Sequence, residues 1–168
     1  MTVPATAPAR IALDFDALYR AARDDVFAYV ATLLHDRGAA EDVTAQAFER
    51  AFRKRAKFDS RRGSERAWLF GIARNAALDE LRKRRRTVTL ATEPVSDAAG
   101  PEDEADLALR RAAVRTALAD LPARERELIA LKFHAGLDNA ELAAVLGVSV
   151  TNAGTQLHRA MTKLRRSV

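Results

Sequence analysis

Apolar residues recur at three- and four-residue spacing along most of this chain, the pattern of helices that bury one face. The first apolar stripe predicts a helix over residues 14–35, and Gly38 is placed to take the left-handed conformation that ends such a helix. The pattern resumes over residues 39–57. Ser64 is suited to cap a third helix that runs to about residue 85. The second of these helices carries on its apolar face Val43, Ala47, Phe48, Ala51 and Phe52.

Two segments lack this pattern. Residues 1–12 are rich in Pro, Ala and Thr, which predicts a flexible tail. Residues 87–105 combine prolines, small residues and acidic residues without periodicity, which predicts a flexible acidic linker. Apolar stripes return over residues 106–168. We therefore expect an all-α protein of two small helical domains, residues 13–86 and 106–168, joined by the linker.

The second domain contains the pattern of a helix-turn-helix. Asp138 followed three residues later by Glu141 predicts a capping box at the start of a short helix. Gly147 relieves the backbone of a tight turn, and a second helix follows Ser149. In a helix-turn-helix this second helix enters the major groove of DNA. The alternative is a helical hairpin without a ligand, but a cationic cluster on the second helix favours DNA: Arg159, Lys163, Arg165 and Arg166.

At 100° per residue the second helix separates into two faces. The face toward the core carries Ala153, Leu157, Ala160 and Leu164. The opposite face carries Thr151, Thr155, His158, Arg159 and Thr162, with Asn152 and Gln156 along its edge. Gly154 lies beside this polar face, where it destabilises the helix by about 1 kcal/mol relative to Ala. Two explanations stay open for it, close approach of the helix to the DNA backbone and simple tolerance.

Basic residues are concentrated in the middle of the chain. The formal net charge of the 168 residues is +5. Residues 50–86 contain fourteen Lys and Arg against four Asp and Glu. The flanking segments are acidic, with three basic against eight acidic residues in 13–49 and three against seven in 87–120. A solvated surface explains any single run of charge, but a basic block between two acidic ones favours a face that binds a polyanion.

Several classes of function find no support in the residues. The chain has no cysteine, which excludes disulfides, thiol catalysis and Cys-based zinc sites within it. It has no phosphate-binding glycine loop or metal-ligand cluster, and His35, His134 and His158 are scattered. We therefore expect no enzymatic activity, no cofactor or metal, and no small-molecule substrate. The lack of a signal peptide and of a long apolar run predicts a cytoplasmic protein without membrane attachment.

Longer stretches of the chain resemble a known family. AEDVTAQAFERAFR and FDSRRGSERAWLFGIARNAALDELRKRRR resemble region 2 of bacterial sigma-70 factors of the extracytoplasmic function (ECF) group. ALADLPARERELIALKFHAGLDNAELAAVLGVS, with LHRAMTKLR after it, resembles region 4 of the same group. The resemblance covers residues 13–86 and 107–166. It implies a non-enzymatic factor that binds core RNA polymerase through its β′ coiled coil and β subunit, recognises the −35 and −10 elements of promoter DNA, and helps to open the duplex. It also adds an anti-sigma factor as an expected partner.

The resemblance further implies three sets of site residues. The surface that docks on the β′ coiled coil includes Glu41, Asp42, Gln46, Glu49, Arg50 and Arg53. The −10 element is read as unstacked single strand, which calls for aromatic walls, hydrogen-bond donors and cations at the phosphates. The matching positions are Phe58, Phe70 and Asn75, with Arg61, Arg62, Arg66, Arg74, Arg82, Lys83 and Arg84 for the phosphates. The −35 element is contacted by Ser149, Thr151, Asn152, Thr155, Gln156, His158, Arg159 and Lys163. Trp68 lies in an apolar stripe, which favours a core position over stacking on a base.

The second helix of the helix-turn-helix departs from the family pattern. Relatives carry two basic residues before the leucine that matches Leu157, whereas this chain has Gly154 and Gln156 there. We hypothesise that Asn152 or Gln156 reads adenine in an A-rich −35 element, with Arg159 on a guanine or a phosphate. Two other functions stay open at this point. One is a stand-alone helix-turn-helix regulator, and the other is an interaction protein that keeps the sigma fold without promoter recognition.

Overall fold

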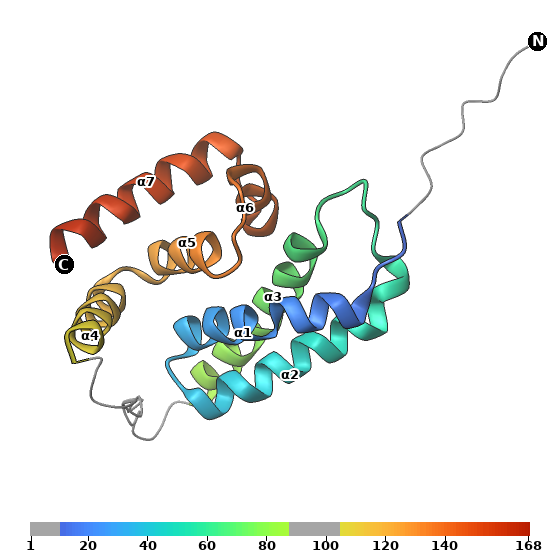
Figure 1. The fold of residues 1–168 in the computed structure, drawn as a ribbon, viewed down its shortest axis with the longest axis horizontal. Helices are drawn as coiled ribbons and strands as arrows, with labels where there is room; N and C mark the ends of the chain where they lie inside the picture. The colour runs from blue at the N-terminus through green and yellow to red at the C-terminus, as the bar shows by residue number, and fades with distance from the viewer. Residues whose placement is uncertain (1–10, 88–104) are drawn as a thin grey trace, which may run out of the picture.

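The computed structural model describes residues 11–87 and 105–168, which form helices and no strands (Figure 1). The all-α prediction is confirmed. No described helix has the length and apolar character that a transmembrane span requires. The predicted tail and linker fall almost wholly in residues 1–10 and 88–104, outside the described residues. The elements are α1 (Phe15–Leu34), α2 (Arg37–Lys54), the 3-10 turn η1 (Arg55–Lys57), α3 (Glu65–Arg86), α4 (Ala105–Asp120), α5 (Ala123–Phe133), α6 (Asn139–Leu146) and α7 (Val150–Ser167).

The first unit, residues 11–87, is a three-helix domain in which α1, α2 and α3 pack against one another. Each helix begins at a side-chain cap. Asp14, Asp36 and Ser64 each accept a hydrogen bond from the backbone N–H three residues later, at 3.0–3.1 Å. These bonds satisfy amides that the first turn of a helix leaves free. The third helix therefore starts at the predicted cap. Side chains buried between the helices include Ala22, Val26, Val30, Val43, Ala47, Leu69 and Ala73.

The turn between α1 and α2 differs from the prediction. The left-handed residue is His35, with φ of 52°, and its N–H donates to the Ala31 carbonyl at 2.9 Å. Gly38 lies inside the first turn of α2, so its prediction as the helix end was wrong. The reason is that Asp36 caps α2 immediately after α1 ends, which leaves only His35 to make the turn.

The end of α2 is also shorter and more exposed than predicted. The α-helix ends at Lys54, and η1 continues as one tighter turn. Phe52, expected on the apolar face, is 47% exposed. Its ring contacts Phe15 edge-on at 5.2 Å between centroids, and the Arg55 guanidinium lies 3.7 Å from its centroid. A cation over the ring face offsets part of the exposure of the aromatic surface.

The second unit, residues 105–168, contains the helix-turn-helix as predicted. Asp138 and Glu141 form the capping box at the start of α6, with hydrogen bonds of 2.8 and 3.0 Å. Gly147 ends α6 in the left-handed conformation, with φ of 67°. Ser149 then caps α7, where its hydroxyl accepts from the Asn152 N–H at 3.1 Å. α4 packs against α7 through an apolar cluster of Leu118, Leu121, Ile129, Leu157, Ala160, Met161 and Leu164.

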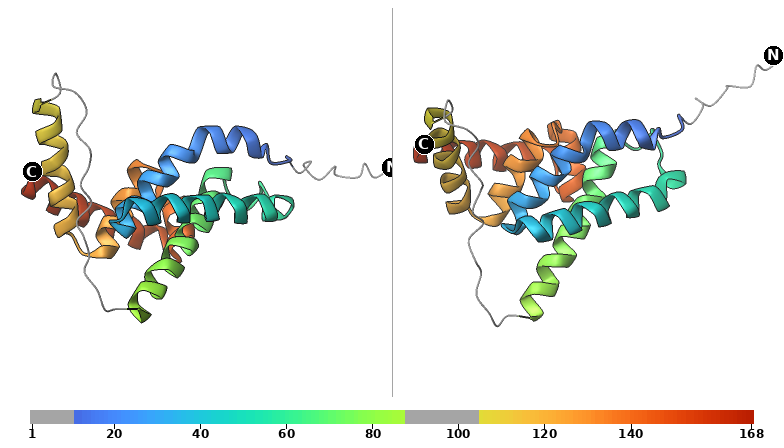
Figure 2. Two further views of the ribbon diagram at one scale, coloured as in Figure 1. Left: turned by 90° about the horizontal axis from the view of Figure 1, so that it is seen from below. Right: turned by 60° about the horizontal axis from the view of Figure 1, so that its bottom comes forward.

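The two units pack against each other along one contact surface, which we call the seam. In the seam α1 and α3 of the first unit contact α5 and α6 of the second (Figures 1 and 2). A single hydrophobic core runs through it, because α5 and α6 residues belong to the same buried cluster as those of the first unit. The second unit contributes to that cluster Leu128, Ala130, Leu131, Ala135, Leu137, Leu142, Ala143, Leu146 and Ala153.

Candidate nucleic-acid and polymerase interfaces

α7 presents its predicted polar face to solvent. Seven of the eight residues predicted to contact the −35 element are exposed, and Gln156 is half-buried at the edge. Ala153 and Ala160 are fully buried on the opposite side. The two faces predicted from the helical period are therefore confirmed. The exposed members are Ser149, Thr151, Asn152, Thr155, His158, Arg159 and Lys163.

The two amides on α7 are joined to each other. Gln156 Nε2 donates a hydrogen bond to Asn152 Oδ1 at 2.7 Å, one helical turn away. Gln156 Oε1 is buried and makes no hydrogen bond. Asn152 accepts this bond through Oδ1, so its Nδ2 group is left available as a donor on the exposed face. The pair is thus held in one orientation, which favours contact with hydrogen-bond acceptors in the major groove.

Gly154 has a packing reason that the sequence did not reveal. A Cβ placed on it would lie 3.3 Å from Nδ2 of Asn139, the first residue of α6. This distance is tighter than an ordinary van der Waals contact, so glycine makes room for the Asn139 side chain. Gly154 therefore lies beside the first residue of α6, which adds a packing explanation to the two that the sequence left open.

One cation of α7 is already paired. Lys163 Nζ donates to Glu125 Oε1 of α5 at 2.6 Å. Arg159 is exposed, and Arg165 and Arg166 lie in the last turn of the helix. The first three turns of α7 therefore offer Arg159 as their basic group, beside hydroxyls and amides.

The aromatic residues expected at the −10 element are buried. Phe58 is 7% exposed and packs edge-on against Trp68, with 5.4 Å between ring centroids. Phe70 is 0% exposed and packs edge-on against Tyr29 at 5.5 Å. Trp68 is half-buried and packs on the core. Neither phenylalanine ring offers an open face for stacking on a base in this arrangement.

Two of the arginines expected at the −10 element lie in the seam. Arg74 Nε donates to Glu127 Oε1 of α5. Arg66 donates to Asp25 Oδ2 and to the Ala135 carbonyl, both at 2.8 Å, and to the His134 carbonyl at 3.2 Å. Both guanidiniums are partly buried, at 19% and 34% side-chain exposure. Arg66 thus makes three hydrogen bonds inside the molecule, and Arg74 makes one.

The acidic partner Glu127 was not anticipated from the sequence. It is 6% exposed and also accepts a hydrogen bond from the Tyr29 hydroxyl at 3.1 Å. Burial, followed by the negative charge of Glu127, raises the pKa of Tyr29 well above its usual 10.0, so its hydroxyl stays a donor. A signal was present, because Glu127 lies one helical turn before Leu131 on the apolar face of α5. A carboxylate on such a face needs a buried partner.

The other −10 residues remain at the surface. Asn75 is exposed on α3, and Arg61 and Arg62 are exposed in the loop before it. Arg61 forms a bidentate pair with Asp59 at 2.9–3.0 Å. The last turns of α3 extend away from the rest of the molecule (Figure 2). A cleft of about 480 Å³ there is lined by Asp79, Arg82, Lys83, Arg86 and Thr87. Arg84 is turned inward, to Asp36 at 3.0 Å.

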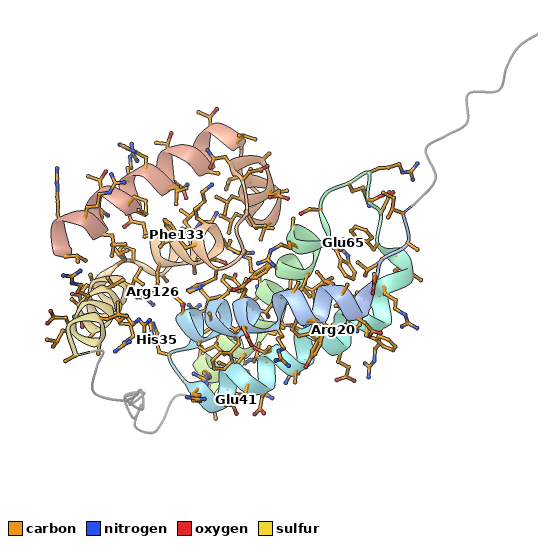
Figure 3. All side chains as sticks on the ribbon, in the orientation of Figure 1. Arg20, His35, Glu41, Glu65, Arg126 and Phe133 are labelled. Carbon is orange, nitrogen blue, oxygen red and sulfur yellow. The ribbon has the colours of Figure 1, made fainter. Side chains whose placement is uncertain are left out.

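The predicted polymerase surface lies on the outer side of α2, away from the seam. Five of its six members are exposed, and Arg50 is half-buried and pairs with Asp79 of α3 at 3.1 Å. Glu41 pairs with Arg37, and Glu49 with Arg53, along the helix. Figure 3 labels Glu41 on α2. Beside this face a cleft of about 420 Å³ is lined by Tyr19, Arg23, Phe27, Glu41, Thr44, Ala45 and Phe48.

His35 and Arg126 meet at the other end of the seam (Figure 3). Arg126 Nη1 donates to His35 Nε2 at 2.6 Å, and the same guanidinium binds the Leu118, Ala119 and Leu121 carbonyls at the end of α4. Burial, and then the charge of Arg126, lowers the pKa of His35. Within the described residues, no group of three His, Asp or Glu side chains is arranged to hold a metal ion.

The fold is that of a two-domain helical protein with a helix-turn-helix in its second unit. Residues 18–87 match the family Sigma-70 region 2, and residues 111–164 match the family Sigma-70, region 4. The chain is 34% identical over 158 residues to the ECF RNA polymerase sigma factor SigL of Mycobacterium tuberculosis, covering 89% of this chain and 88% of SigL. It therefore belongs to the ECF group of sigma-70 factors, which are transcription initiation factors and not enzymes.

Two further similarities support this assignment. The ECF sigma factor BldN of Streptomyces coelicolor is 32% identical over 156 residues, which cover 90% of this chain but only 59% of BldN. The sigma factor RpoE of Bartonella quintana, solved in complex with the anti-sigma factor NepR, superposes with a TM-score of 0.73 at 25% identity. The superposition covers 92% of this chain and 96% of RpoE. The family expected from the sequence is thus confirmed.

Proposed function

We propose that this chain binds core RNA polymerase and directs initiation at promoters that carry −35 and −10 elements. The observation that carries this proposal is the presence of both sigma regions in one chain, with an exposed α2 face and an exposed α7 face. It is tested by run-off transcription with core polymerase and a library of randomised promoters. Start sites with a shared pair of upstream elements are expected. Failure to bind core polymerase in a pull-down contradicts the proposal.

The outer face of α2 is the polymerase-docking surface in this proposal. Its support is the exposure of Gln46, Glu49 and Arg53 on the far side from the seam. Reversing the charge with Arg53→Glu is expected to weaken capture by core polymerase strongly. Arg20→Glu, an exposed charge reversal on α1, serves as the control. Equal loss in both variants argues against α2 as the docking face.

α7 reads the −35 element through its amides in this proposal. The Gln156–Asn152 hydrogen bond holds the two side chains together at the edge of the polar face that carries Arg159. Asn and Gln side chains can hydrogen-bond to the major-groove edge of adenine, and Arg159 can hydrogen-bond to a guanine or a phosphate. Transcription from the promoter library by Gln156→Ala is expected to show relaxed preference at one −35 position. An unchanged preference means that α7 only docks on DNA.

The cationic end of α3 and the loop before it hold the −10 strand. Arg61, Arg62, Arg82 and Lys83 are at the surface, and Asn75 offers an amide to a base edge.

An anti-sigma factor is proposed as a second partner, because the similar RpoE is solved in complex with one. The protein acts in the cytoplasm, where polymerase and chromosome are. Tight, specific binding to a duplex by the isolated protein favours a stand-alone regulator instead.

A further inference from the structure

The two amides at the edge of α7 differ in their position around the helix. Gln156 follows Asn152 by four residues, and at 100° per residue it lies about 40° nearer to the buried side that carries Ala153 and Ala160. Asn152 is accordingly exposed, whereas Gln156 is half-buried and its Oε1 atom is buried. The exposed face of this helix is the one that a helix-turn-helix inserts into the major groove. Asn152 is therefore the amide that faces a base, and Gln156 lies behind it.

The hydrogen bond between the two amides determines which end of Asn152 faces outward. Gln156 Nε2 donates to Asn152 Oδ1 at 2.7 Å. Because Gln156 lies nearer to the buried side, this bond turns the carbonyl of Asn152 toward that side. The amide group is planar and carries Oδ1 and Nδ2 on separate branches, so Nδ2 points away from Gln156. Asn152 thus presents two N–H donors to the exposed face, and not its carbonyl oxygen.

The opposite orientation of the pair is less favourable. If both amides turned over, Asn152 Nδ2 would donate to Gln156 Oε1, and Nε2 of Gln156 would take the buried position. In the observed orientation one buried atom lacks a hydrogen-bond partner, the carbonyl oxygen Oε1. An amide nitrogen carries two N–H groups, so the reversed pair would leave two buried donors unpaired. Each of them would lose its hydrogen bonds to water without a replacement. The observed orientation is therefore the stable one.

The four bases offer different partners to a pair of donors in the major groove. Guanine presents two neighbouring acceptors, N7 and O6. Adenine presents one acceptor, N7, beside its N6 amino group, which is a donor, and cytosine also presents an amino group. Thymine has a single acceptor beside a methyl group. Asparagine binds adenine when its carbonyl accepts from the N6 amino group, but the Asn152 carbonyl is turned toward Gln156. An Asn152 held in this way matches guanine.

We propose that Asn152 specifies a guanine at one position of the −35 element, and that Gln156 is a positioning residue that keeps Asn152 Nδ2 directed toward the groove. This inference rests on the proposed function of α7, and it replaces the adenine expected from the sequence by guanine. From the sequence the two amides are equivalent candidates for the base contact. Their hydrogen bond and their unequal burial give them different roles.

Two substitutions of Gln156 separate positioning from direct contact. Gln156→Glu keeps the shape of the side chain, but at pH 8 its carboxylate is ionised and can only accept a hydrogen bond. It therefore binds Asn152 Nδ2, which turns the Asn152 carbonyl toward the groove and exchanges a donor for an acceptor there. Gln156→Ala removes the hydrogen bond, so that Asn152 can present either end of its amide to a base.

Three further variants serve as controls. Asn152→Ala removes the proposed base contact, and Gln156→Glu in the Asn152→Ala background tests whether position 156 acts through position 152. Arg159→Ala removes a second exposed side chain of α7 that is able to bind guanine. Ser167→Glu adds the same negative charge as Gln156→Glu at an exposed position of the same helix. Circular dichroism verifies that each variant is folded.

The base preference is measured by competition among duplexes that carry each of the four bases at each −35 position. They are bound to the chain with core polymerase and, at low salt, to the chain alone. In the wild type we expect about tenfold tighter binding of guanine than of adenine at one position. Asn152→Ala should abolish this preference, Gln156→Ala should reduce it, and Gln156→Glu should reverse it in favour of adenine and cytosine. Arg159→Ala and Ser167→Glu should preserve it, and in the Asn152→Ala background Gln156→Glu should leave the preference unchanged.

A substitution in the DNA tests the same contact from the other side. At the position that responds to Asn152→Ala, 7-deazaguanine lacks the N7 acceptor and should bind the wild type more weakly than guanine. Hypoxanthine keeps both N7 and O6, so it should bind as guanine does. Equal binding of 7-deazaguanine and guanine overturns the proposed contact.

The remaining outcomes are also decisive. The proposal is overturned if the position that responds to Asn152→Ala prefers adenine or thymine, or if Gln156→Glu leaves a guanine preference unchanged. A guanine preference that only Arg159→Ala removes overturns it as well. If Gln156→Glu does not fold, Gln156→Ala with and without Asn152→Ala decides in the same way. The proposed function is decided separately, by pull-down of core polymerase. A chain that selects guanine through Asn152 but fails there supports this inference and contradicts the proposed binding to polymerase.

Discussion

The two helices assigned to DNA hold their charge in opposite ways. α3 and the loop before it contain most of the basic residues of the first unit, but Arg66, Arg74 and Arg84 are engaged with acidic groups or carbonyls of the molecule itself. α7 carries Arg159, Lys163, Arg165 and Arg166, and its polar face is open to solvent. The difference shows that the number of cations near a helix does not predict which surface is free to bind DNA. That depends on where their partners lie.

The seam explains how this contrast arises. α5 lies between α1 and α7, and it presents Glu127 to the first unit and Glu125 to α7. Glu127 is buried and hydrogen-bonded twice, whereas the pair of Glu125 with Lys163 is at the surface. A surface ion pair contributes little to stability, and a buried pair is destabilising to break. α5 thus holds Arg74 of α3 by a buried pair and Lys163 of α7 by a more exposed one.

The largest expected effect is on the free energy of unfolding, when a buried side chain in the core shared by the two units is truncated. Leu131 of α5 is fully buried in the cluster shared across the seam. Leu131→Ala is expected to lower the free energy of unfolding by about 2–5 kcal/mol, because it removes apolar contacts and leaves a cavity. Chemical denaturation measures the loss. Leu109→Ala, at an exposed leucine of α4, is the control. A loss below 1 kcal/mol at Leu131 contradicts a shared core.

A smaller effect separates the two DNA surfaces by their salt dependence. Gln156→Ala is expected to reduce discrimination at one −35 base by about 1–3 kcal/mol and to leave the salt slope of binding unchanged. Lys83→Ala should weaken binding of all sequences alike and reduce the slope of log K against log salt by about one. The measurement is affinity of the polymerase complex for promoter variants at several salt concentrations. The same behaviour in both variants removes the contrast between α3 and α7.

Acidification is expected to loosen the seam. Burial lowers the pKa of His35 and of His134, with the charge of Arg126 adding to the first and Asp25 opposing the second. A histidine whose pKa is lowered in the packed state favours that state above its usual 6.5, and this stabilisation is lost as the pH falls. Distances between spin labels on cysteines introduced at Arg20 of α1 and Ser167 of α7, both exposed, should therefore lengthen when the pH is lowered from 7.5 to 5.5. His35→Asn, which suits the left-handed backbone, should weaken the trend. Distances independent of pH contradict the role of these groups.

The smallest effect concerns Gly154. Gly154→Ala gains about 1 kcal/mol of helix propensity but places a Cβ against Asn139. The net change in stability is expected to be near zero. Adding Asn139→Ala should release the gain, and thermal unfolding of the single and double variants measures it. A full gain in the single variant shows that Asn139 does not limit position 154.

The helices and the faces of α7 were predictable because they depend on local spacing and caps. The stripes, Ser64, the capping box at Asp138 and the turn at Gly147 each act within a few residues. The errors arose where neighbouring elements compete. His35 adopts the left-handed conformation of the turn because Asp36 caps the next helix. The space for a side chain at Gly154 is limited by Asn139, which belongs to another helix.

The closed surface of the first unit was not predictable in this way. Tyr29, Arg74 and Glu127 lie far apart in the chain and meet only because α5 packs against α1, within reach of Arg74 on α3. Sequence spacing places each of them on a helix face, but not opposite one another. Resemblance to a family assigns roles for a complex with DNA, and it carries no information on which of those groups are occupied in the free protein.

The contact of Arg66 with the end of α5 has a consequence for the order of the helix-turn-helix itself. When the units separate, the His134 and Ala135 carbonyls lose this donor, and the final turn of α5 loses a tertiary cap. Fraying there is expected to speed hydrogen–deuterium exchange of the amides from 134 to 137, while those of α7 keep their protection. Separation of the two units thus makes residues 134–137, which lead into α6, more flexible. The helix-turn-helix of α6 and α7 can then change its orientation when it binds DNA.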